Sequence, residues 1–132
     1  MIPLGSFGPG GFFLNLEKDM PDPLNTYVLH ASIADVGTAS TVYFTVPRSG
    51  YLRQVETVLW AAITGADDVL TVTVDGTAAS PTITVANASS AEGDYDVGNY
   101  CVPVHQGSRI KIANSGASTG TAPLSYAVTL SF

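Results

Sequence analysis

The side chains best suited to catalysis or metal binding are few and widely spaced along the chain. The two histidines, His30 and His105, lie far apart, and neither has an HxH or HExxH spacing. The single cysteine, Cys101, lies in the apolar sequence YCVPV, whereas a reactive thiolate needs an electropositive, partly exposed setting. We therefore predict a strand histidine, a turn histidine and a small buried cysteine, none of them catalytic.

Acidic side chains come closest together in EGDYDVGN, residues 92–99. Asp94 and Asp96 are two residues apart and follow Glu92, and clustered oxygens on a loop suit a hard cation such as Ca²⁺. The segment lacks the spacing and the distal glutamate of an EF-hand, so a solvated loop is the simpler interpretation. The sequence has no GxSxG or P-loop motif either. We expect no metal site, no cofactor and no enzyme activity.

The aromatic residues that could serve an interface are Trp60, Tyr95 and Tyr100. An exposed Trp would suggest a sugar platform or an interface hot spot. The alternation of apolar residues around Trp60 changes phase midway along its strand, which is typical of a bulge. We therefore expect Trp60 in the core, and an interface role for these three aromatics is the alternative.

The composition limits the class of protein. A chain of 132 residues is most simply one domain, and its 12% charged residues are half the usual share of about 25%. The net charge is −6 and the basic residues are scattered, which argues against direct binding to nucleic acid or to an anionic membrane. One cysteine allows no intrachain disulfide, and no apolar run is long enough to span a membrane. We expect a protein made in a cytoplasm.

From residue 26 onwards, apolar and polar residues alternate between short turn clusters, which predicts strands. In TVYFTV, for example, Val42, Phe44 and Val46 share one face. The expected strands are 26–33, 41–46, 51–63 with a bulge, 69–74, 81–86, 100–104, 109–114 and 123–132. Asp75-Gly76 predicts a type I′ turn. About eight strands at this spacing predict an all-β fold, a single antiparallel β-sandwich of jelly-roll or immunoglobulin-like topology.

Residues 1–25 differ from the sandwich domain, 26–132, and predict an extended Gly/Pro-rich N-terminal arm. Glycines and prolines at this density prevent a stable helix or central strand. The apolar side chains that need a partner are Phe7, Phe12, Phe13, Leu14 and Leu16. They could lie across the protein's own sandwich, or dock on a partner or neighbouring subunit. We favour the second alternative.

Several segments resemble small proteins encoded among the head genes of tailed bacteriophages. The similar elements are AITGAD before the strand LTVTV, the strand GSRIKI, a Gly/Ser/Thr loop before a final VTL strand, and the opening GSFGPGG. Such proteins resemble capsid decoration, or cement, proteins. The resemblance implies a β-sandwich homotrimer on the outside of the virion, where it would contact the major capsid protein and clamp adjacent capsomers. It implies no catalytic residues.

Two other functions remain open from the sequence. A receptor- or carbohydrate-binding module of a head fibre or tail would need exposed aromatics. An enzyme would need His30 or His105 beside an acid in a pocket.

Overall fold

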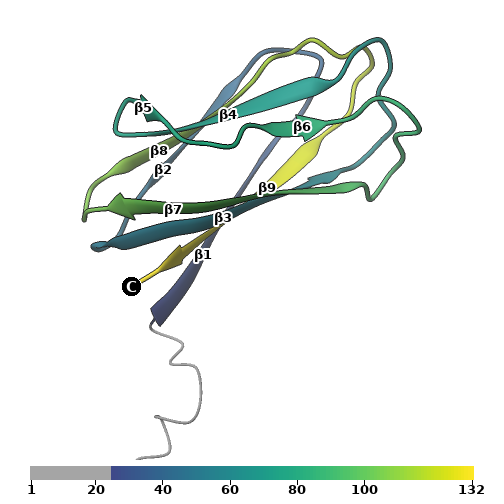
Figure 1. Cartoon of the computed structure of the whole chain (residues 1–132). Coiled ribbons are helices and arrows are strands. Elements are labelled where there is room, and N and C mark those ends of the chain that lie inside the picture. Colours follow the sequence, from purple (N-terminus) through teal and green to yellow (C-terminus); the bar gives the residue numbers. More distant parts are fainter. Residues whose placement is uncertain (1–24) are drawn as a thin grey trace, which may run out of the picture.

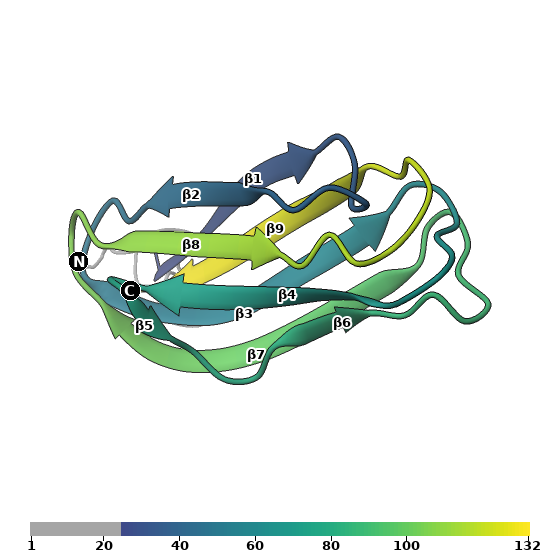
Figure 2. The same ribbon diagram turned by 90° about the horizontal axis from the view of Figure 1, so that it is seen from above.

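The alternating segments form strands in a computed structural model that describes residues 25–132. The strands are β1 (Thr26–Ile33), β2 (Thr41–Thr45), β3 (Gly50–Leu59), β4 (Asp68–Val74), β5 (Thr77–Ala78), β6 (Ile83–Val85), β7 (Tyr95–Val104), β8 (Arg109–Asn114) and β9 (Leu124–Ser131). They form two packed antiparallel sheets, one ordered β1-β9-β3-β7 and the other β2-β8-β4-β5, with β6 also paired to β4 (Figures 1 and 2). The predicted all-β sandwich is confirmed.

The order of the strands decides between the two predicted topologies. Consecutive strands alternate between the sheets, except that β5 and β6 both follow β4 in its own sheet. When β5 and β6 are taken as one position, each sheet has four positions in the order of a jelly roll. An immunoglobulin-like sandwich would group the strands differently, so the topology is a jelly roll.

The core lies between the sheets and is built from alternate residues of each strand. In β3, Leu52 and Val55 are both buried although they are three residues apart. The pairing register shifts between Leu52 and Gln54, so Arg53 occupies a bulge that reverses the alternation. This is the phase change expected within 51–63.

The turn at Asp75-Gly76 has positive φ angles of 49° and 88°, which fits the predicted type I′ hairpin. Two strand bounds differ from the expectation by four residues or more. β3 ends at Leu59, four residues early, and β7 begins at Tyr95, within the predicted polar loop. The extra part of β7 pairs with Gln54–Val58 of β3. The existing ladder of β3 supplies backbone hydrogen bonds to residues whose composition alone predicts a loop.

The sandwich has two different ends. The arm end contains Asn25, the C-terminus and the short turns 46–49, 75–76 and 105–108; the amide of Phe132 donates to the carbonyl of Asn25 at 2.8 Å. The loop end contains the longer connections 34–40, 60–67, 86–94 and 115–123. These two ends separate the charged residues, as described below.

Candidate functional site

The arm residues predicted to bind a partner lie outside the described part of the chain. They are Phe7, Phe12, Phe13, Leu14 and Leu16. Their contacts, and the boundary of the arm at residue 25, stay predictions.

Trp60 is on the surface, so the prediction that it lies in the core is wrong. Its side chain is 55% exposed and directly follows the buried Leu59. The bulge at Arg53 sets the phase of β3, which turns Leu59 inward and the next residue outward. The indole Nε1 donates to the Oγ of Ser125 at 2.6 Å. This hydrogen bond to β9 holds the ring against the outer face of the four-stranded sheet.

Tyr95 lies on the same outer face, directly opposite Val58 in the β3–β7 pairing. Tyr95 is 56% exposed and Val58 is also exposed. Partial desolvation, followed by the negative charge of Glu56, raises the pKa of the Tyr95 hydroxyl. We call Val58, Trp60 and Tyr95 the Trp60 patch. Exposed apolar side chains gathered on one face mark an interaction surface more than scattered ones do.

Tyr100 does not belong to this surface, which corrects its prediction as an interface aromatic. Its side chain is 7% exposed, because Tyr100 faces inward where Tyr95 faces outward on the same strand. The hydroxyl donates to the carbonyl of Pro81 at 2.6 Å. Burial raises the pKa of Tyr100 to about 12. The residue is a core tyrosine whose polar end is satisfied.

The histidines and the cysteine are not brought together. His30 lies on β1 opposite Ala127, whereas His105 lies in the turn between β7 and β8. Cys101 is exposed rather than buried, since it occupies an outward position of β7. Its sulfur accepts a hydrogen bond from Arg53 Nη1 at 3.5 Å.

The acidic segment 92–99 forms a turn followed by the start of β7. The carboxylate of Asp94 accepts a hydrogen bond from the amide of Ala91 at 2.9 Å. Desolvation, and then the charge of Asp94, raises the pKa of Asp96. Within residues 25–132 no three His, Cys, Asp or Glu side chains converge as a metal site. No helix in this range is long and apolar enough to cross a membrane.

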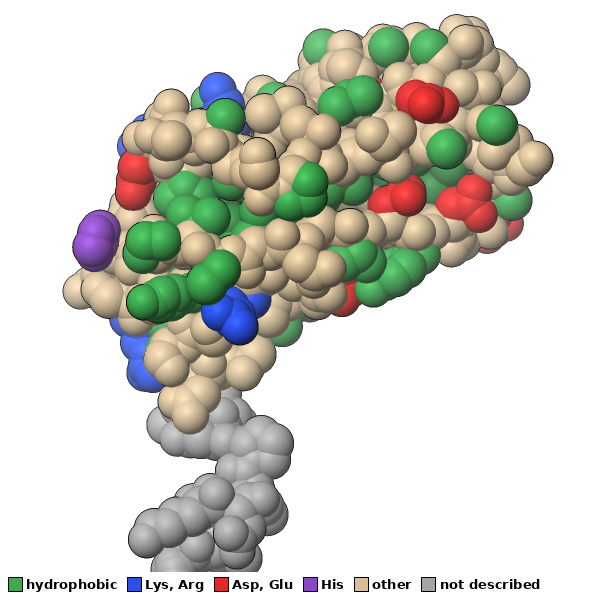
Figure 3. Space-filling model, in the orientation of Figure 1, with side chains coloured by type: hydrophobic (Ala, Val, Ile, Leu, Met, Phe, Trp, Pro, Cys, Tyr) green, Lys and Arg blue, Asp and Glu red, His purple; other side chains and the backbone are tan. Residues whose placement is uncertain are grey.

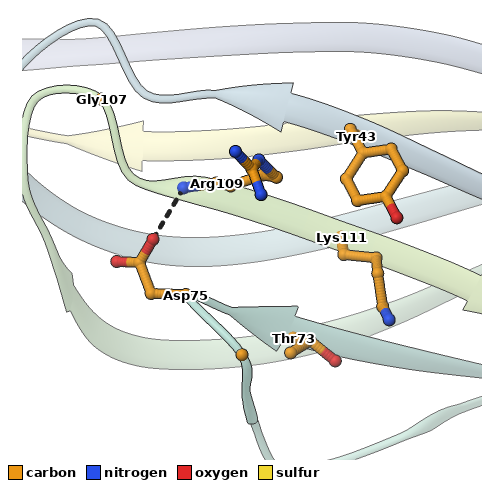
Figure 4. Close-up of a pocket in the computed structure, with 7 residues that line it drawn as sticks. Tyr43, Thr73, Asp75, Gly107, Arg109 and Lys111 are labelled. Carbon is orange, nitrogen blue, oxygen red and sulfur yellow. Dashed lines mark hydrogen bonds between the residues drawn. The ribbon is translucent and has the colours of Figure 1, made fainter.

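A hollow of about 400 Å³ lies on the outer face of the other sheet, near the arm end (Figure 4). We call it the basic hollow; its lining residues are Tyr43, Thr73, Asp75, Gly76, Gly107, Arg109 and Lys111. The sequence alone did not point to this site. Its only signal was that Tyr43, Arg109 and Lys111 occupy outward positions of their strands, and sheet pairing alone makes them neighbours.

Charges are separated along the sandwich (Figure 3). The acids of the loop end are Asp35, Asp67, Asp68, Glu92, Asp94 and Asp96. The arm end holds Arg48, whose guanidinium carbon lies 4.6 Å from the ring centroid of Phe132. Arg109 and His105 are also at this end. Asp75 also lies at the arm end, so most acids of residues 25–132 gather at the loop end, whereas the arm end carries charges of both signs.

No protein-family profile and no curated protein sequence matches this chain. Solved structures are similar in fold. A chain of the Cyanophage Pam1 capsid asymmetric unit is 19% identical with a TM-score of 0.51, over 82% of this chain and 85% of that one. A family 35 carbohydrate-binding module from Clostridium thermocellum is 14% identical with a TM-score of 0.45, over 80% and 92%.

The catalytic unit of a GH87 alpha-1,3-glucanase from Streptomyces thermodiastaticus is 16% identical with a TM-score of 0.46. The match covers 81% of this chain but spans 26% of the glucanase chain. At 19% identity the likeness to the Pam1 chain shows the fold alone, and a fold of this kind serves many functions.

Proposed function

We propose that the protein is a capsid decoration, or cement, protein of a tailed bacteriophage, which binds the outer capsid surface and bridges capsid subunits. The observation that carries the proposal is the exposed Trp60 patch, on a sandwich preceded by an arm with further apolar residues. The apolar side chains of the patch and of the arm are removed from water only when a partner covers them. The phage-head resemblance of the sequence supports this function, and jelly rolls are frequent among capsid proteins. The fold it shares with a chain of the Pam1 capsid is compatible with it.

The two surfaces have separate roles in this proposal. The arm, through Phe7, Phe12, Phe13, Leu14 and Leu16, contacts the major capsid protein. The Trp60 patch packs against a second copy of the chain in a homotrimer, where aromatic anchors supply most of the contact energy. Trimers placed on the shell multiply weak contacts by symmetry. Because the protein binds assembled shells and not separated subunits, it stabilises the assembled state.

The proposed location is the exterior of the virion, after synthesis in the host cytoplasm. No catalytic step belongs to this function, because the contribution of the protein is the area it buries between subunits.

Deleting residues 1–20 tests the role of the arm. Both packed sheets are built from strands between Thr26 and Ser131, so the shortened protein should keep its far-ultraviolet circular dichroism and its cooperative unfolding. Its co-sedimentation with empty shells of the parent phage should fall by at least about tenfold, because the avidity of arm contacts is lost. Shell binding at full strength by the folded, shortened protein would refute the arm's role.

The double substitution Trp60→Ser and Tyr95→Ser tests the trimer surface. Light scattering after size exclusion should give the mass of a trimer for the parent protein and of a monomer for the variant. A matched control is Tyr43→Ser, which removes an aromatic side chain of 60% exposure from the other sheet and should leave the trimer intact. A parent protein that is monomeric both in solution and on shells would overturn the trimer.

A carbohydrate- or receptor-binding module is the second candidate, because Trp60 and Tyr95 expose rings of the kind that stack on sugars. A glycan array with the full-length protein separates the two functions. Glycan binding that the Trp60→Ser variant loses, together with no binding to shells, would favour this candidate over the decoration function.

A further inference from the structure

The basic hollow is built from three neighbouring strands whose outward side chains share a row. Lys111 of β8 is paired with Tyr43 of β2 on one side and with Thr73 of β4 on the other. Arg109 lies two residues before Lys111 on the same face, at the arm end of β8. Figure 4 shows these side chains around a common space. The hollow therefore combines two cations, a phenol and a hydroxyl on a rigid sheet.

The cations of the hollow are available to an outside group. Asp75 is the acid among the lining residues, and its carboxylate is held by the domain, since it accepts from the Arg109 amide at 2.9 Å and from Ser108 Oγ at 2.8 Å. Among residues 25–132, no carboxylate forms an ion pair with the Lys111 ammonium or the Arg109 guanidinium, although the charge of Arg109 also acts on the nearby Asp75. A ligand that fits this hollow carries carboxylates to meet the cations, and a flat or apolar ring to lie on Tyr43.

A segment of the chain itself has this chemistry. Residues 17–23 read EKDMPDP and contain the carboxylates of Glu17, Asp19 and Asp22 with two prolines. Proline rings and adjacent acids are suited to a surface of tyrosine and cations. The hollow and the segment are therefore complementary in charge and in the kind of side chain they bring.

Asn25 precedes β1 of the four-stranded sheet, so residues 17–23 have to pass over the edge of the sandwich to reach the hollow on the other sheet. Asn25 and the hollow are both at the arm end, and β1 and β2 lie at the same edge of the sandwich (Figure 2). The three residues from Asn25 to Asp22 span about 10 Å when extended, and the six to Asp19 about 20 Å. A tethered segment that is long enough to reach a site has an effective concentration in the millimolar range, so that weak ion pairs suffice.

We propose that the basic hollow is the docking site for residues 17–23 of the arm. In this proposal docking holds residues 17–23 on the five-stranded sheet. The first half of the arm, with its phenylalanines, stays available to a partner. The proposal concerns the chain alone and does not depend on the identity of the partner. It would hold for a decoration protein and for a carbohydrate-binding module alike.

Zero-length crosslinking of the full-length protein with a carbodiimide tests the proposal. This reagent joins an amine to a carboxylate only when they are in contact, and mass spectrometry of the digest identifies the pair. We expect Lys111 to be joined to Glu17, Asp19 or Asp22, and the yield to fall several-fold in 1 M NaCl because salt screens exposed ion pairs. An equal mixture of ¹⁴N and ¹⁵N protein distinguishes docking within a chain from docking on a second copy.

Three variants sharpen the result. The triple variant Glu17→Gln, Asp19→Asn and Asp22→Asn should lose the crosslink, whereas Asp35→Asn, Asp67→Asn and Glu92→Gln at the loop end should keep it. Lys111→Arg keeps the charge but removes the reactive amine, so it should abolish the product without changing the fold. Lys111 joined only to carboxylates of residues 25–132, or left unmodified while Lys18 reacts, would overturn the proposal. Protection of Lys111 by an added polyuronate in the same reaction would instead assign the hollow to acidic glycans.

Discussion

The loop end and the arm end of the sandwich both tie β8 to β4 through a carboxylate, but in opposite surroundings. Asp68 is the first residue of β4 and is fully buried at the loop end. Asp75 directly follows β4 and is exposed at the arm end. Each accepts hydrogen bonds from residues that flank β8. A buried carboxylate consolidates the loop end, whereas an exposed carboxylate, whose hydrogen bonds depend on pH, consolidates the arm end.

At the loop end the bonds form a buried network. Asp68 Oδ1 accepts from Ser115 Oγ at 2.8 Å. The side chain of Asn114 accepts from the amide of Ser40 at 2.7 Å and donates to the carbonyl of Val36 at 3.1 Å. Asn114 is 5% exposed, so water has little access to its hydrogen-bond partners when its side chain is replaced. The network holds the long loops 34–40 and 115–123 together.

At the arm end the bonds are local. The Oγ of Ser108 accepts from the amide of His105 at 2.9 Å and donates to Asp75. Hydrogen bonding from the Arg109 amide, and then from Ser108, lowers the pKa of Asp75 below its ordinary value of 3.8. Electrostatic interaction with His105 and Arg109 also lowers this pKa. These hydrogen bonds therefore stabilise the short turns of the arm end beside the basic hollow.

The largest expected effect is at the buried network. Replacing Asn114 with Ala removes hydrogen bonds to the amide of Ser40 and to the carbonyls of Val36 and Thr38. Each partly or fully buried group that loses its partner costs about 1–3 kcal/mol. We expect the free energy of unfolding, measured by urea denaturation, to fall by about 3 kcal/mol. Asn99→Ala is the matched control, because Asn99 is exposed and accepts a long bond of 3.4 Å from Gln54. Equal losses for the two variants would mean that burial does not distinguish these amides.

A smaller loss is expected at the arm end. Ser108→Ala removes two hydrogen bonds of a side chain that is 5% exposed, and we expect a loss of about 1–2 kcal/mol by the same measurement. Ser49→Ala, in the exposed turn 46–49, should change stability by less than about 0.5 kcal/mol. A loss for Ser108→Ala as large as that for Asn114→Ala would show that the two ends are equally consolidated.

The smallest effects concern pH, and they have opposite signs at the two ends. Because the pKa of Asp75 is lowered in the fold, its stabilising contribution is complete above pH 3.8 and is lost as pH falls through the folded value. Because the pKa of Asp96 is raised, its ionisation opposes folding as pH rises above 3.8. Asp75→Asn should therefore reduce stability at pH 7 and weaken the loss on acidification, and Asp96→Asn should increase stability at pH 7. Urea midpoints between about pH 2.5 and 7 measure both, and shifts of the same sign at pH 7 would contradict the comparison.

The alternation of apolar and polar residues was sufficient to predict most strands, because a strand buried on one face repeats its apolar residues with a period of two. β2 and β8 match the expected segments closely, and the bulge in β3 was visible as a change of phase. The beginning of β7 was not, because Asp96, Gly98 and Asn99 are strand residues only by virtue of the ladder that β3 offers them. β5, which has two residues, is too short to leave any pattern.

The exposure of side chains was harder to predict than the strands. Trp60 and Tyr100 were placed on the wrong sides, since one residue of register decides which face a side chain occupies. The prediction that Cys101 is buried was wrong for the same reason, because an apolar sequence context does not determine which face of the sheet a side chain occupies. The basic hollow joins residues 43, 73 and 111, whose proximity depends on which strands pair.

Local backbone preference and the alternation of apolar residues are enough to predict the all-β class, the period of the strands, the type I′ turn at Asp75-Gly76 and the distinct composition of the arm. The jelly-roll order, the outward position of Trp60, the burial of Asp68 and the gathering of cations into one hollow become visible only in the folded chain. The physical reason is that these features depend on pairing between strands distant in sequence. Hydrophobic alternation leaves many such pairings open, and the packing of the two sheets selects one of them.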